Sequence, residues 1–286
     1  MVLKLVNNLK KNKLSIIKFK GLNQSNNYNL NKIKKIDLYL TLNKLTGDLF
    51  LNNPSSYKNL ISPHNWLKYN EPEDHIKKIT KIYEKNFSVN KKFVLGITYK
   101  DKSFIDNLNK KKIKKKYIID QEINLGLKKN KGVECIQNNL SNFKKISFNY
   151  HKKPNLIIAR HIWEHFYDQE KFVLFLKNIS DKSTIFYFEI PDCEKSIKNY
   201  DYSMIWEEHL HYYSMNTFLN SLERFDFEII KYGRYKYPYE DVLYAFFKLK
   251  KNSKKISNKI DNDIKHILSY GKKFEQINKN LKKKFK

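Results

Sequence analysis

The densest group of chemically reactive side chains lies in the nine residues Trp206–Ser214. This stretch holds two adjacent carboxylates, two imidazoles, an indole and two phenols. Upstream, the strand-like run Ser183–Ile190 leads into Pro191-Asp192, and the strand-like run Asn155–Ala159 leads into the segment Arg160–His165. Ligands of open parallel sheets bind beyond the carboxyl ends of the strands. The sequence therefore predicts one acid–base site where these segments meet.

The elements that must position this site alternate between strands and helices from residue 91 onward. Such alternation requires parallel strand pairing with helices on both faces of the sheet. The apolar residues of Gln169–Ile179 recur at helical spacing and predict one of these helices. The predicted fold is α/β, with a seven-stranded Rossmann-like sheet whose last two strands pair antiparallel. The predicted strands are Phe93–Thr98, Tyr117–Ile119, Val133–Gln137, Asn155–Ala159, Ser183–Ile190, Phe227–Tyr232 and Asp241–Leu249.

Smaller units are expected on both sides of this sheet. Ile36–Leu42 and Asp48–Asn52 have the pattern of a β-hairpin, and Pro72 is placed to open a helix over Glu73–Asn86. Apolar residues three to four apart predict a further helix near the end of the chain, over Ser253–Lys286. The sequence thus predicts a small β-rich amino-terminal domain over residues 1–88, the sheet domain over 89–250 and a basic carboxyl-terminal helix over 251–286.

The formal net charge of +28 raises the question of a nucleic-acid partner. Only three of the 57 basic residues are arginines, whereas nucleic-acid sites favour arginine because its guanidinium grips phosphate and guanine bidentately. The lysines also spread over the whole chain instead of forming one stripe. Lys, Asn, Ile, Tyr and Phe are all encoded by A/T-rich codons, so a genome biased towards A and T would produce this composition with no selection for binding. We therefore predict no nucleic-acid partner.

The cysteine count and the hydropathy pattern bear on where the protein works. Two cysteines form neither a disulfide framework nor a four-cysteine zinc site, which favours a reducing cytoplasm. The first residues are interrupted by Lys10, Lys11 and Lys13 before any long apolar run, unlike a signal peptide. No apolar run approaches the length of a membrane span, so no membrane association is expected.

One motif offers a different chemistry. His161 to His165 spell H-x-x-E-H, the inverted zinc-peptidase motif. That motif belongs within a helix, so that both histidines share one face, and it needs a distant third ligand. Here a hydrophobic strand immediately precedes it, which leaves at best the first turn of a helix. A zinc peptidase is therefore kept only as an alternative, which metal analysis of the protein would test.

Three segments together resemble the sugar C-methyltransferase family. They are Ala159–His165, Glu189–Asp192 and the Glu-His-x-x-Tyr-Tyr-Ser pattern at 208–214. The order of parts agrees over roughly residues 35–285, but only 155–215 carries specific motifs. The resemblance implies a class I methyltransferase fold that uses S-adenosylmethionine (SAM) to methylate a carbon of a nucleotide-linked keto-sugar. The expected partner is therefore a small molecule, with SAM as the cofactor.

The resemblance also implies which residues hold SAM. The family's loop glycines fall at Thr98 and Lys102, and its acidic residue is kept as Asp101. A lysine with positive φ at position 102 would cost about 1–2 kcal/mol. Asp120 sits where a carboxylate would take the ribose hydroxyls, although an aspartate there is also a common turn or helix cap. The expected cofactor-binding residues are Thr98, Asp101, Asp120 and Arg160.

Other departures from the family limit what can be carried over. No cysteine occurs in Leu40–Leu45, where the family places a zinc site, so no metal is predicted. Trp206 replaces the family's tyrosine two residues before the Glu-His pair. The chain also ends where the family continues into a second glycine-rich unit. A protein of the same fold that no longer binds SAM well, and that works as an accessory subunit, is the alternative function.

Methylation beside a ketone requires a base that removes a weakly acidic proton and donors that hold the enolate. His209 can serve as this base, with Glu208 orienting it or stabilising its charged form, and Tyr212 or Tyr213 could donate to the oxygen. His165 resembles the family's second histidine. Each residue also has a structural reading. The Glu208-His209 pair could satisfy buried backbone groups, and the tyrosines could pack in the core.

Overall fold

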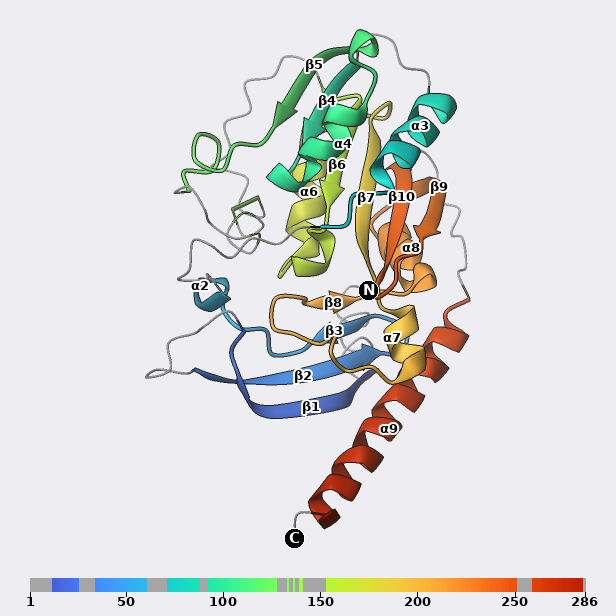
Figure 1. The fold of residues 1–286 in the computed structure, drawn as a ribbon. Coiled ribbons are helices and arrows are strands. Elements are labelled where there is room, and N and C mark those ends of the chain that lie inside the picture. The colour runs from blue at the N-terminus through green and yellow to red at the C-terminus, as the bar shows by residue number, and fades with distance from the viewer. Residues whose placement is uncertain are drawn as a thin grey trace, which may run out of the picture.

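The fold is seen in a computed structural model, which describes residues 12–25, 34–60, 71–87, 92–127, 133, 136, 139–140, 153–250 and 259–284. Two sheets organise these residues, one of six strands and one of four. Figure 1 shows the six-stranded sheet above the four-stranded one, with the long helix α9 (Asp261–Lys284) running beside the four-stranded sheet. No helix in these described ranges is long and apolar enough to cross a membrane.

The six-stranded sheet has a parallel part and an antiparallel edge. Strand β4 (Lys92–Gly96) pairs in parallel with β5 (Ile113–Ile118) on one side and with β6 (Leu156–Arg160) on the other. Strand β7 (Ile185–Asp192) continues the parallel part, and β10 (Asp241–Leu249) and β9 (Phe227–Tyr235) close it antiparallel. The predicted antiparallel pair is confirmed. After β4 the chain forms β5 on one side of it and then crosses to form β6 on the other side. This reversal of strand order places a topological switch point between β4 and β6.

Helices cover both faces of this sheet, as parallel pairing requires. On one face α6 (Gln169–Ile179) and α8 (Met215–Arg224) bury Phe172, Leu176 and Phe218. On the other face α3 (Ile76–Asn86) and α4 (Lys102–Asn107) pack against the strands. Helix α3 was expected within the amino-terminal unit, but its apolar stripe is buried against the larger sheet.

The predicted third strand, Val133–Gln137, is wrong. Val133 and Ile136 are helical and bury their side chains in the core shared with α6 and α8. A short apolar run does not distinguish a strand from a buried helix, because both bury continuous hydrophobic surface. The sheet therefore contains six strands in the described part of the chain instead of the seven predicted.

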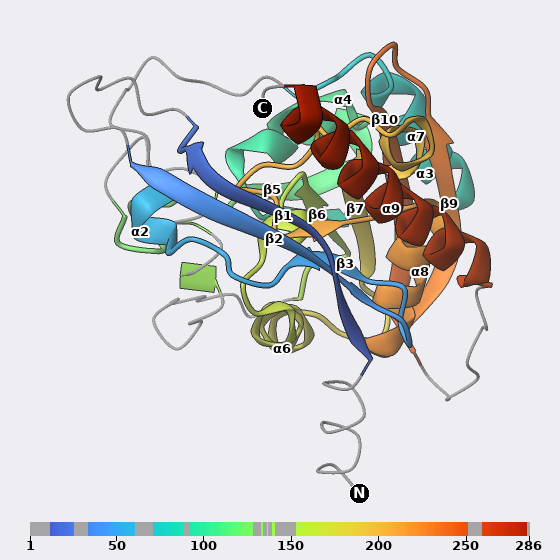
Figure 2. The same cartoon turned by 90° about the horizontal axis from the view of Figure 1, so that it is seen from below.

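The four-stranded sheet combines the start of the chain with a segment from far downstream. It has the order β1 (Lys13–Asn23), β2 (Lys35–Asn43), β3 (Leu49–Leu51) and β8 (His211–Tyr212). Its core also takes side chains from α7 (Glu194–Asn199) and α9. Figure 2 shows α9 lying alongside β1. The segment before β8 is thereby held between the two sheets. A short helix, α2 (Tyr57–Leu60), follows β3.

Candidate active site

The turn after strand β4 is held together by its own side chains. Thr98 Oγ1 accepts a hydrogen bond from Lys100 N (3.3 Å), and Asp101 Oδ2 accepts one from Thr98 N (2.8 Å). Asp101 Oδ1 accepts from Arg160 N at 2.9 Å, which ties the turn to β6. A side chain on Gly96 would meet the Asp101 Cβ at 2.9 Å, so the glycine makes room for this carboxylate. Thr98 and Asp101 are buried and satisfied within the protein, and neither presents a polar atom to a ligand.

The expected backbone strain at Lys102 is absent. Lys102 has a φ of −58°, in the right-handed helical region, so a lysine fits there without penalty. The turn is a 3-10 helix, Tyr99–Asp101, that leads into α4. The missing glycines therefore do not distort this loop, and the prediction of a conformational cost is wrong.

Arg160, expected to bind the cofactor, hydrogen-bonds to several segments of the protein itself and holds them together. Its guanidinium is fully buried and donates to Glu189 Oε1 (3.0 Å), Lys100 O (2.7 Å) and Ser103 Oγ (2.8 Å). It also donates to Pro72 O at 3.1 Å and pairs with Glu73 at 3.2 Å. These bonds fasten the segment around residue 72 to the β4 turn. The contacts of Arg160 in the structure are thus internal, and they position the β4 turn.

Asp120 shows the turn-capping arrangement that the sequence left open. Its Oδ1 accepts hydrogen bonds from Glu122 N and Ile123 N, each at 2.8 Å. The residue is exposed, just before the turn that follows β5. The contacts of Asp120 in the structure are thus those of a turn cap.

The buried ion pair of Lys100 and Glu71 lies at the switch point. Lys100 Nζ is 2.5 Å from Glu71 Oε1 and donates to His161 O at 3.2 Å. The His161 ring lies 3.4 Å from Glu71 and 3.0 Å from Glu189. Burial would raise the pKa of Glu71, but His161 and Lys100 lower the pKa to about 2. Burial would likewise lower the pKa of His161, but Glu71, Glu164 and Glu189 raise the pKa to about 10.

The backbone at His161 is in an unusual conformation. Its φ of 47° lies in the left-handed region, which a residue with a side chain rarely adopts. The conformation turns the chain sharply between β6 and the 3-10 helix Trp163–His165. Strain of this kind persists where surrounding contacts fix the residue, and it concentrates at functional sites.

A cleft of about 580 Å³ opens beside the β4 turn. Its size lies within the range of small-molecule sites. Tyr99 is 52% exposed and the Lys102 side chain 72% exposed, so neither fills the cleft. None of the predicted cofactor residues lines it, and no sequence motif points to the two carboxylates flanking Pro72. The lining residues are Glu71, Glu73, Tyr99, Lys100, Lys102, Ser103 and Asp106.

The Trp206–Ser214 stretch is anchored at several points. Glu207 accepts hydrogen bonds from the backbone and hydroxyl of Ser25 (2.5 and 3.1 Å). Leu210 N donates to Glu164 O at 2.9 Å, which docks the loop onto the end of β6. Ser214 caps helix α8 and bonds to Asp263 of α9. These contacts set the position of His209 within the loop.

Tyr212, expected to donate to the substrate oxygen, is used by the fold. Its hydroxyl donates to Trp206 O (3.0 Å) and accepts from Trp206 N (3.3 Å), and the residue is 1% exposed. Tyr213 is also buried, and its hydroxyl accepts a hydrogen bond from Gln169 at 2.7 Å. The packing alternative is therefore the one observed for both tyrosines, and we leave Tyr212 out of the catalytic set.

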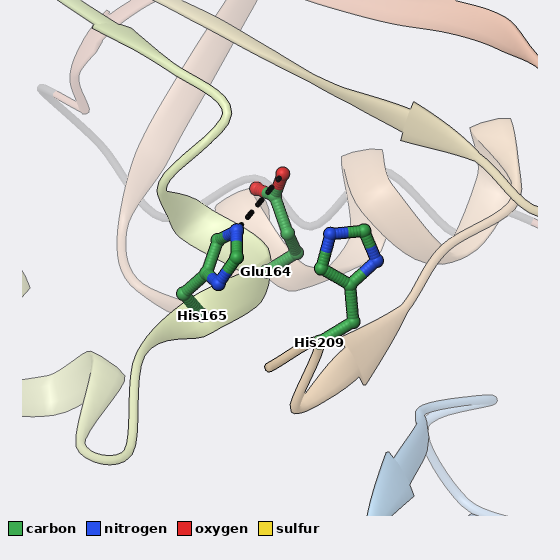
Figure 3. Close-up of side chains that lie close together, drawn as sticks. All are labelled: Glu164, His165 and His209. Carbon is green, nitrogen blue, oxygen red and sulfur yellow. Dashed lines mark ion pairs between the residues drawn. The ribbon is translucent and has the colours of Figure 1, made fainter. Parts of the chain in front are cut away.

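Of the other three predicted catalytic residues, His165 and His209 come together, and they meet at Glu164. Figure 3 shows the rings of His165 and His209 on either side of the Glu164 side chain. The two ring centroids are 4.9 Å apart, and the His209 ring also stands 5.0 Å from Trp206. His209 is partly exposed, whereas Glu208 and His165 are buried. Burial lowers the pKa of His209 below its ordinary value, and His165, Lys100 and His161 lower it further. His209 is therefore neutral and able to accept a proton.

Residues 64–232, more than half of the chain, match the family model of a methyltransferase domain. None of the curated proteins compared with the chain matches it. Among solved structures, a SAM-dependent methyltransferase from Clostridium acetobutylicum shows 14% identity and a TM-score of 0.39, covering 61% of this chain and 89% of that one. The N-methyltransferase NodS from Bradyrhizobium japonicum shows 12% identity and a TM-score of 0.40, covering 62% and 96%. Structural likenesses this low do not identify a chemistry, and the family model carries the assignment.

Proposed function

The chain belongs to the methyltransferase domain family, which makes it a SAM-dependent methyltransferase, and from this premise we propose the reaction it catalyses. The proposed reaction transfers the methyl group of SAM to the carbon beside the ketone of a nucleotide-linked sugar or a similar small keto compound. The observation that carries the proposal is the docking of Leu210 N on Glu164 O. This bond brings the neutral imidazole of His209 to the carboxyl end of β6, next to the switch point.

The residues around the cleft fit SAM in size and in chemistry. The cleft of about 580 Å³ accepts a small molecule, and Glu71 and Glu73 bring carboxylates that suit a sulfonium cation and ribose hydroxyls. Ser103 adds a hydroxyl, and the charge of Lys100 is matched by Glu71. We therefore expect Glu71, Glu73 and Ser103 to hold the cofactor. SAM, when bound, supplies an electrophilic methyl group.

The residues of the motif loop supply the proton chemistry. His209 accepts the proton from the carbon beside the ketone, because burial and neighbouring cations keep its ring unprotonated. Glu208 precedes His209 in the chain, and the ring of His165 lies beside the His209 ring; both residues position that ring.

Proton exchange tests this proposal without requiring the complete reaction. The protein is incubated in D₂O with a nucleotide-linked 4-keto-deoxysugar, and deuterium uptake at the neighbouring carbon is followed by NMR. Wild-type protein should catalyse the exchange, His209→Ala should not, and His266→Ala, an exposed histidine on α9, should behave as wild type. Transfer of labelled methyl from SAM to an amine or hydroxyl compound, with no exchange in any keto compound, would overturn the proposed substrate.

A second function is favoured by the state of the predicted cofactor residues. Thr98, Asp101 and Arg160 form their hydrogen bonds with other groups of the protein, and Asp120 caps its own turn. An accessory protein that kept the fold and lost SAM binding would show this arrangement. Calorimetry separates the two: absence of a heat signal at millimolar SAM favours the accessory role, and saturable binding favours the enzyme.

A further inference from the structure

We propose that Glu164, His165 and His209 form a binding site for a divalent transition-metal ion. Each residue offers one ligand atom, and these atoms all lie within 4.8 Å of one another. Glu164 and His165 belong to the 3-10 helix after β6, and His209 comes from the loop before β8, so the fold brings them together across 44 residues of chain. Figure 3 shows the three side chains converging on one small volume.

The carboxylate of Glu164 is the observation that calls for a cation. Glu164 is 1% exposed, and neither of its oxygens accepts a hydrogen bond from any residue in the described part of the chain. Its nearest basic nitrogen atoms are His161 Nδ1 at 3.7 Å and His165 Nε2 at 3.9 Å, both beyond hydrogen-bond length. A buried carboxylate without hydrogen-bond partners is costly, and such groups in proteins are paired or coordinate metals.

Neighbouring positive charges are already closer to other carboxylates. Lys100 pairs with Glu71 at 2.5 Å, and Arg160 pairs with Glu189 at 3.0 Å. The ring of His161 lies 3.0 Å from Glu189 and 3.4 Å from Glu71, nearer than to Glu164. The side chains around Glu164 therefore leave its charge only partly balanced.

This site differs from the one that the H-x-x-E-H motif suggested. The residues of that motif do not form a helix, because β6 runs to Arg160 and a single 3-10 turn follows. The His161 ring faces Glu71 and Glu189, away from a shared face with His165. Only the last two residues of the motif enter the cluster, and His209 takes the place of the missing histidine. The inverted zinc-peptidase reading is wrong in its geometry.

Two imidazole nitrogens and one carboxylate oxygen select the class of ion. This donor set suits Zn²⁺ or Fe²⁺, whereas Ca²⁺ and Mg²⁺ prefer oxygen ligands alone. Three protein ligands leave at least one coordination position open for water or substrate. Ligand bonds of about 2.0–2.2 Å require the three side chains to close inward, which rotations of the side chains can provide.

The inference goes beyond the proposed function but shares His209 with it. A ring nitrogen that coordinates a metal ion has no lone pair for a proton. Metal binding and proton acceptance at that nitrogen therefore exclude one another. Bound metal should inhibit the exchange reaction, and removal of metal should restore it.

The test uses the full-length chain after dialysis against a chelator. Zn²⁺ is titrated by calorimetry and Co²⁺ by its visible absorption, in wild type and in Glu164→Gln, His165→Ala and His266→Ala. One ion should bind per chain, and loss of either ligand should weaken binding by at least about 100-fold, more than the loss of a residue that only hydrogen-bonds to a ligand. His266→Ala should bind as wild type, because this exposed histidine lies on α9 outside the cluster.

Several outcomes would overturn the site. They are absence of binding in folded wild-type protein, and equal affinity in Glu164→Gln or His165→Ala. Circular dichroism checks the fold of each variant, and Glu164→Gln keeps the size of the side chain. The result is independent of methyl transfer, because binding is read directly. If the protein binds metal but the metal-free form does not catalyse deuterium exchange, only the proposed function is wrong. If it catalyses exchange but does not bind metal, only the metal site is wrong.

Discussion

The ammonium nitrogen of Lys100 lies 2.5 Å from Oε1 of Glu71, and both side chains are largely buried where strand β4 ends. The pair joins a segment that precedes α3 to the turn in which the sequence lacks the expected glycines. It also forms one wall of the cleft. A lysine in this turn therefore serves as an internal cation whose charge is matched by the protein. The cleft stays open because Lys100 points into the protein, toward Glu71 and His161.

Breaking this pair should destabilise the protein. Glu71→Gln leaves the Lys100 ammonium buried without a counter-charge, and removal of one partner of a buried pair costs about 3–5 kcal/mol. The free energy of unfolding in urea measures the effect. Glu71→Gln combined with Lys100→Met should lose less than Glu71→Gln alone, because no unpaired charge remains.

An exposed pair gives the matched control. Lys102 and Asp106 are one helical turn apart in α4, with side chains 72% and 40% exposed. Asp106→Asn should change the free energy of unfolding by less than about 1 kcal/mol. If Glu71→Gln and Asp106→Asn lower the free energy of unfolding equally, burial does not determine how much the Lys100–Glu71 pair stabilises the protein.

Acid should weaken the protein through Glu71. The pKa of this carboxyl is lowered from 4.5 to about 2 in the folded state. A lowered carboxyl pKa contributes stability above the unfolded value, and that stability is lost as pH falls from about 4.5 toward 2. The contribution at neutral pH is about 3 kcal/mol. Urea denaturation between pH 6 and pH 3 should give a steeper decline for wild type than for Glu71→Gln. If the free energies of unfolding of wild type and Glu71→Gln decline in parallel with falling pH, the lowered pKa of Glu71 is contradicted.

Replacement of His209 should separate catalysis from binding. His209→Ala removes the proposed proton acceptor and should lower kcat by about 10²–10⁴-fold. The Kd for SAM should stay near the wild-type value, because His209 does not line the cleft. Steady-state kinetics and calorimetry give the two quantities. A large rise in the Kd for SAM with little change in kcat would move His209 from proton transfer to cofactor binding.

Tyr212→Phe should affect the fold and spare the chemistry. The lost hydroxyl bonds to the backbone of Trp206, so the free energy of unfolding should fall by about 1 kcal/mol. The value of kcat measured well below the melting temperature should remain within a few-fold of wild type. A hundredfold loss of kcat in a stably folded Tyr212→Phe protein would restore the catalytic role that the resemblance implied.

Local pattern determined most elements near the site. Helix α6 has the bounds expected from its apolar spacing, and the Asp168 carboxylate caps its first turn by accepting from Lys171 N. The strand before Arg160 and the antiparallel pair of β9 and β10 also agree with the sequence. Periodicity and caps are properties of neighbouring residues, so the sequence displays them directly. The run at Val133 and Ile136 failed because it is too short to show a period.

Only the tertiary structure decided what the polar side chains do. Arg160 and Pro72 are 88 residues apart in sequence, yet the contact between them turns an expected ligand-binding residue into an internal clamp. The charge of Lys100 is likewise committed by Glu71 and His161 from other loops, and the hydroxyl of Tyr212 by the backbone of Trp206 within its own loop. The sequence by itself determined that acids and histidines gather beyond β6. Packing decided which of these side chains remain available for chemistry. A buried polar group forms hydrogen bonds with the partners that the fold places beside it, and it can then no longer bind a ligand with the same atoms.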